Sequence, residues 1–64
     1  MDVQQVNERV ASIAAQDDDE QQHAQEDRLH RDVLKAIADG APNAAELASA
    51  ALKTIDLDFD RWYG

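Results

Sequence analysis

The chain of 64 residues has no cysteine, one proline, two glycines and three aromatic residues. Without cysteine it has neither a disulfide framework nor a thiolate zinc site, the usual stabilising devices of so short a chain. Two glycines cannot build a glycine-rich phosphate loop. No apolar run approaches the ~18 residues that span a bilayer, and no basic segment precedes an apolar run at the start. We therefore expect a soluble cytoplasmic protein with no membrane partner.

Large apolar side chains are scarce. Of 28 hydrophobic residues, 12 are alanine, which leaves 16 larger ones. A single domain of this size has room for one small core and little concavity, so an enzyme with its own substrate pocket is not expected. The thin core also predicts that a partner, or a second copy in a homodimer, buries further apolar surface.

Basic residues are few as well: six Lys and Arg stand against 14 Asp and Glu, a formal net charge of −8. This excess of acid disfavours nucleic acid as a partner, since phosphate binding needs Lys and Arg to replace counterions. It disfavours anionic membrane surfaces for the same reason. The charge favours a partner protein with a basic surface.

Three helices are predicted, over about residues 2–15, 18–39 and 43–54. Residue pairs with capping-box spacing mark the three starts. They are Asp2 and Gln5 for the first helix, Asp17 and Glu20 or Asp18 and Gln21 for the second, and Asn43 and Glu46 for the third. Gly40 is placed to end the second helix. Large apolar residues at helical intervals give each helix a buried stripe: Val3, Val6, Val10 and Ile13; Leu29, Val33, Leu34 and Ile37; and Leu47, Ala51, Leu52 and Ile55.

Two segments lie outside these stripes. Residues 16–28 contain no large apolar side chain and are expected to face water. Residues 55–64 carry Phe59, Trp62 and Tyr63, which predicts an aromatic C-terminal tail docked on the helices. The expected fold is all-α: a helical hairpin and a short third helix in one domain, with a dimer as one arrangement open to it.

Metal and catalytic patterns are incomplete. Asp56, Asp58 and Asp60 resemble the start of a calcium loop, but Arg61 occupies the glycine position and the closing glutamate is missing. His23 and His30 are two helical turns apart, roughly 10 Å, which is too far to share an ion within one helix. We expect both on a solvated face, and a metal bridging two copies is the alternative. The candidate nucleophiles, Ser12 and Ser49, have no base at a suitable spacing. We therefore expect no metal, cofactor or catalytic residue.

Residues 33–54 resemble the general helix-turn-helix pattern, two helices joined across Gly40 to Asn43. The resemblance implies a DNA-binding or transcription-regulatory module, which is the alternative function. The second helix exposes chiefly Glu46, Ser49 and Lys53, however, and base reading calls for Arg, Lys, Asn or Gln.

The clustered carboxylates are the candidate partner-binding residues, because acidic helical surfaces match basic protein patches. A face kept solvated for solubility is the alternative. The candidates are Asp17, Asp18, Asp19, Glu20, Glu26 and Asp27.

A short, acidic, cysteine-free chain of capped helices that ends Ile55 to Trp62 resembles the small accessory proteins of tailed phages and prophages. Such proteins often sit on a host protein and block it. The resemblance therefore implies a non-catalytic protein-binding module or inhibitor.

Overall fold

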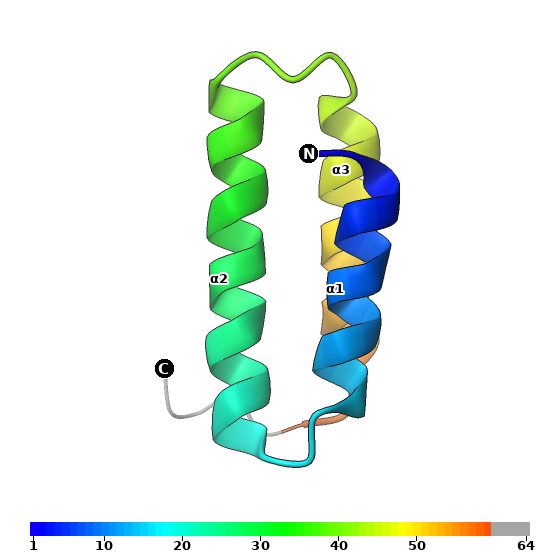
Figure 1. Ribbon diagram of the computed structural model, residues 1–64, viewed down its shortest axis with the longest axis vertical. Coiled ribbons are helices and arrows are strands. Elements are labelled where there is room, and N and C mark those ends of the chain that lie inside the picture. The colour runs from blue at the N-terminus through cyan, green and yellow to red at the C-terminus, as the bar shows by residue number, and fades with distance from the viewer. Residues whose placement is uncertain (60–64) are drawn as a thin grey trace.

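The computed structural model describes residues 1–59 as a bundle of three helices (Figure 1). The helices are α1 (Val3–Ala15), α2 (Asp19–Ala38) and α3 (Ala44–Ala51), and a 3₁₀ helix, η1 (Leu52–Asp56), continues α3. α2 runs antiparallel to α1 and α3 (Figure 1), and each helix contacts the other two. The all-α, three-helix prediction is confirmed. The predicted aromatic tail ends in Trp62 and Tyr63, which lie outside the described residues.

The start of α1 has the predicted capping box. The Asp2 carboxylate accepts a hydrogen bond from the Gln5 backbone N–H at 2.7 Å, and the Gln5 side-chain oxygen accepts one from the Asp2 backbone N–H at 2.9 Å. Two N–H groups that a helix start leaves unpaired thus acquire partners. The local sequence therefore determines where α1 begins.

The end of α2 is set by Gly40, as predicted. Its φ of +95° lies in the left-handed region that favours glycine. The Gly40 N–H donates to the Ile37 carbonyl at 3.0 Å, and the Ala41 N–H donates to the Ala36 carbonyl at 3.1 Å. This pair of bonds is the Schellman motif, which reverses the chain at the end of α2.

The predicted cap of α3 is wrong, because the Asn43 side chain makes no capping hydrogen bond. Capping residues normally have extended backbone, as Asp2 (ψ 170°) and Asp18 (ψ 118°) do, whereas Asn43 has ψ 36°. The side chain is therefore not positioned over the first turn. The first backbone bond of α3, from the Leu47 N–H to the Asn43 carbonyl at 3.0 Å, is formed as in α1 and α2.

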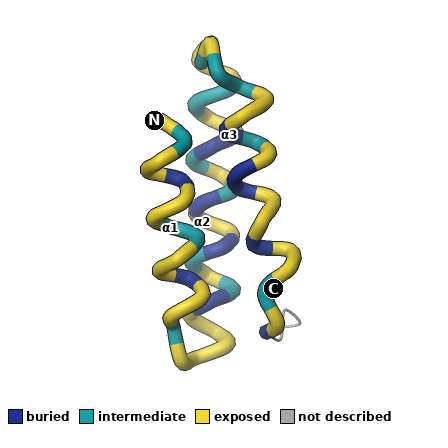
Figure 2. Tube along the Cα trace, turned by 90° about the vertical axis from the view of Figure 1, so that its right-hand side faces the viewer, coloured by how far each residue is buried: buried dark blue, intermediate teal, exposed yellow. Residues whose placement is uncertain are grey.

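The core lies along the axis between the three helices (Figure 2). Its hydrophobic members come from all three helices and from the segment after η1: Val6, Ile13, Leu29, Val33, Leu47, Ala50, Ala51 and Phe59. Three polar residues are buried with them, namely Gln22, Glu26 and Thr54. The prediction that residues 16–28 face water is therefore wrong at Gln22 and Glu26.

The predicted stripes are too wide, since Leu34, Leu52 and Ile55 are 65%, 54% and 61% exposed. The reason at the C-terminal end is a change of helix type. A 3₁₀ helix has three residues per turn, so the side chain beneath Ala51 is Thr54, and Thr54 is fully buried in place of Ile55. Leu34 follows the buried Val33 and lies at the edge of the stripe, where the surface of α2 no longer packs against α1 and α3.

Phe59 is 9% exposed and belongs to the core, so its truncation tests how far the C-terminal segment stabilises the bundle. Phe59→Ala is expected to lower the free energy of unfolding by about 3 kcal/mol, as other buried phenylalanines do. Urea unfolding followed by circular dichroism measures the change. Asp58→Ala, at an exposed neighbour, is the control and should shift stability by no more than about 0.5 kcal/mol. Equal stability of the two variants would contradict a core role for Phe59.

Candidate protein-binding surface

The connection between α1 and α2 and the first turn of α2 present four consecutive carboxylates, from Asp17 to Glu20, and all four residues are exposed. Asp18 is the N-cap of α2, where its Oδ1 accepts a hydrogen bond from the Glu20 backbone N–H at 3.1 Å. Asp19 and Glu20 occupy the first turn, where negative charge interacts favourably with the helix dipole. The fold thus accounts for part of the acidic run, and it holds the run on a short, capped turn.

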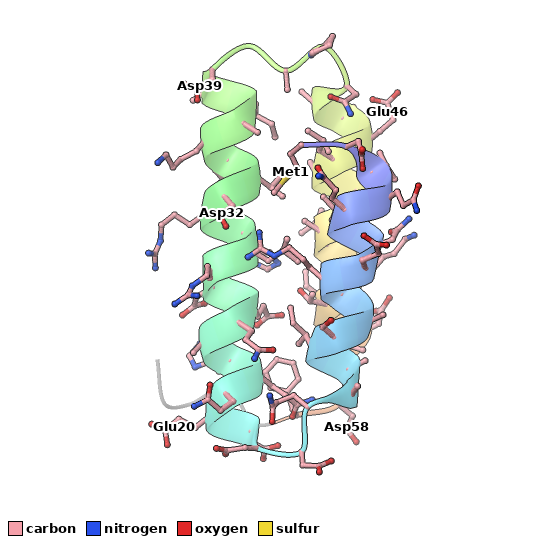
Figure 3. The ribbon with its side chains drawn as sticks, viewed as in Figure 1. Met1, Glu20, Asp32, Asp39, Glu46 and Asp58 are labelled. Carbon is pink, nitrogen blue, oxygen red and sulfur yellow. The ribbon has the colours of Figure 1, made fainter. Side chains whose placement is uncertain are left out.

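A fifth carboxylate reaches this end of the bundle from a distant part of the chain. Asp58 lies at the same end as Glu20, while Asp39 and Glu46 lie at the opposite end (Figure 3). We call Asp17, Asp18, Asp19, Glu20 and Asp58 the acidic end. The ion pairs Arg9–Asp32 (2.8 Å) and His23–Asp27 (3.4 Å) both lie outside it. Counted over residues 1–59, the acidic end therefore carries an excess of negative charge.

The two remaining candidates do not join this cluster. Glu26 is 4% exposed, because it shares the core-facing side of α2 with Gln22, Leu29 and Val33. Asp27 is exposed but lies two turns further along α2, where its Oδ2 is 3.4 Å from His23 Nε2. Gln22, Glu26 and Leu29 follow one another at intervals of four and three residues, so they continue the apolar stripe of α2. This spacing is the signal from which burial of Glu26 in the core could have been predicted.

Both histidines pack against neighbours, in contrast to the expected solvated face. The His23 side chain is 13% exposed. His30 Nε2 lies 2.9 Å from Thr54 Oγ1 and 3.2 Å from the Ala51 carbonyl oxygen. His30 thus ties α2 to the end of α3 and to η1, through contacts with residues 21 and 24 positions later in the chain that no local pattern predicts.

Within residues 1–59 no group of three or more His, Cys, Asp or Glu side chains is arranged to hold a metal ion. The third carboxylate of the calcium-like pattern, Asp60, lies outside the described residues.

A second feature is an apolar groove of about 220 Å³ between α2 and α3. This α2–α3 groove is smaller than the roughly 300–1,000 Å³ typical of sites for small organic ligands. It matches the size of an inserted side chain better than that of a substrate. Residues that line it include His30, Leu34, Ile37, Ala48, Ala51 and Leu52.

α2 and α3 form a helical hairpin. They run side by side in opposite directions (Figures 1 and 2), whereas the helices of a helix-turn-helix cross at about 90–120°. The resemblance seen in residues 33–54 therefore extends to the order of the elements and not to their packing.

The chain shows no significant similarity to any protein-family model, curated protein or solved structure. Within the described part of the chain, no helix has the length and apolar character needed to cross a membrane.

Asp17 and Asp18 are adjacent and both exposed, so comparing them separates capping from surface charge. Asp18→Ala removes the cap of α2 and is expected to lower the free energy of unfolding by about 1 kcal/mol. Asp17→Ala removes the same charge without a cap and should leave stability within about 0.5 kcal/mol. Thermal unfolding followed by circular dichroism measures both, and an equal loss in the two variants would rule out the capping role.

Proposed function

We propose that this protein is a non-catalytic binding module that uses its acidic end to engage a basic surface on another protein. The observation that carries the proposal is the presentation of four consecutive exposed carboxylates on one capped turn, joined by Asp58 from a distant segment. A charge excess gathered at one end of a molecule creates a directional field, which steers a partner of opposite charge.

The turn favours binding for a second reason. Asp18 is held by its capping bond and the neighbouring residues by the helix start, so little backbone freedom remains to be lost on association. Asp17, Asp19, Glu20 and Asp58 supply oxygen acceptors that match Lys and Arg side chains. The acidic end thus offers a preorganised set of acceptors.

A module of this kind acts by covering its target, as the resemblance to phage accessory proteins implies. We propose an inhibitor of a host or regulatory protein in the cytoplasm. We also propose that it self-associates, because its core contains few large side chains, and a homodimer presents two acidic ends.

Charge removal at the acidic end tests the proposal. The triple variant Asp17→Asn, Asp19→Asn, Glu20→Gln keeps the Asp18 cap and removes three charges. It should slow association with the target at least tenfold and reduce the salt dependence of the rate, because such charges act mainly on encounter. The target is first captured from lysate by wild-type protein, and rates are then measured by surface plasmon resonance at several salt concentrations.

The matched control removes three charges elsewhere, with Glu8→Gln, Asp39→Asn and Glu46→Gln, all at exposed positions. It should bind close to the wild-type rate if position matters beyond net charge. Equal slowing of both triple variants would show that only net charge acts. Full binding by the acidic-end variant would place the interface elsewhere.

A further inference from the structure

The α2–α3 groove lies on a face from which large apolar side chains project. Leu34 on α2 is 65% exposed and Leu52 on η1 is 54% exposed, and both line the groove. Ile55, one 3₁₀ turn after Leu52, is 61% exposed. The groove is lined from α2, α3 and η1 without α1, so this face is the side of the hairpin that α1 leaves uncovered. We call it the α2–α3 face.

We infer that the α2–α3 face is the interface with a second copy of the chain, packed so that the two α2 helices run antiparallel. The inference rests on the proposed self-association and assigns it a surface and an orientation. The groove and the projecting leucines lie next to each other on one surface. A two-fold interface requires this arrangement, because each copy must offer both the cavity and the side chain that fills it.

The area of this face suits a dimer. The bundle measures 33 × 20 × 14 Å. α2 is about 30 Å long, α3 together with η1 is about 22 Å long, and each is about 10 Å wide, so the α2–α3 face covers roughly 500 Å² in projection. A standard interface buries about 800 Å² of accessible surface per partner, which a face of this size supplies once side-chain relief is included.

Charge selects the orientation. A parallel pair would bring two acidic ends together, whereas an antiparallel pair separates them by a distance on the order of the 33 Å bundle length. That distance exceeds the Debye length of ~8 Å at physiological ionic strength, so their repulsion is largely screened.

The edge of α2 also matches an antiparallel copy. Asp27 and Lys35 are exposed, and eight residues separate them along the helix. A two-fold axis passing near Arg31 places Asp27 of one copy at the level of Lys35 of the other. Within residues 1–59, neither Arg31 nor Lys35 has an ion-pair partner of its own. Lys35 is therefore available to Asp27 of a second copy, while both bases would repel a basic partner from this face.

Sedimentation velocity on the full chain, from low micromolar to near-millimolar concentration, tests the interface. We expect wild-type protein to dimerise and Leu34→Glu to raise the dimer dissociation constant at least tenfold, since it places a charge at the centre of the apolar contact. Ala11→Glu, which adds the same charge at an exposed position of α1, should match wild type. Circular dichroism confirms that each variant folds.

Charge reversal tests the orientation. Asp27→Lys and Lys35→Glu should each weaken the dimer, and the double variant should recover most of the loss. Because each copy carries a net charge of −8, added salt should strengthen the dimer, whereas it weakens binding of the acidic end to a basic target.

These outcomes separate the inference from the proposed function. A dimer unaffected by Leu34→Glu overturns the α2–α3 face and leaves self-association standing. A monomer at every concentration overturns both. If the acidic-end triple variant dimerises with the wild-type dissociation constant but no longer binds the target, dimerisation and target binding use two separate surfaces.

Discussion

The shortage of large apolar side chains is the constraint on which this structure depends. Alanine supplies 12 of the 28 hydrophobic residues, and within the described part of the chain only six larger ones are buried: Val6, Ile13, Leu29, Val33, Leu47 and Phe59. Partly buried hydrophobic residues, among them Val3, Val10, Ile37 and Leu57, pack against these six. Two alanines of α3 and three polar side chains, Gln22, Glu26 and Thr54, complete the interior.

Polar groups inside a small core must be paired, because an unpaired buried donor or acceptor costs about 1–3 kcal/mol. The Gln22 amide donates to the Ile13 carbonyl at 3.0 Å, near the end of α1. Thr54 donates to the Ala51 carbonyl at 3.2 Å and lies 2.9 Å from His30 Nε2. Among residues 1–59 no buried side-chain nitrogen or oxygen lacks a partner. The two contacts fix where α1 meets α2 and where α2 meets η1, so polar contacts help to specify the packing.

Features that depend on neighbouring residues could be predicted from the sequence, and features that depend on packing could not. The Asp2–Gln5 box, the Asp18 cap and the left-handed Gly40 are local, since each involves groups within a turn of one another. The prediction of an Asn43 cap was wrong because the packing of α2 against α3 determines the backbone conformation of the loop that contains Asn43. Thr54 is buried where the sequence predicted Ile55, because the helix changes to 3₁₀ geometry after Ala51. The spacing of apolar residues does not reveal this change.

The acidic candidates follow the same division. Asp17 to Glu20 stay together because they are contiguous, whereas Glu26 is separated from them by the rotation of α2 into the core. Asp58 joins them only through the path of the chain after η1 (Figure 3). The fold thereby separates two surfaces of different chemistry, a charged end and an apolar face.

We propose that the small core of one copy supplies only part of the stability and that a second copy supplies the rest. The dependence of the melting temperature on protein concentration tests it most directly, because association with a folded partner raises apparent stability by mass action. We expect a melting temperature that rises steadily with protein concentration over two orders of magnitude. A high, cooperative melting temperature that does not change over that range would contradict it.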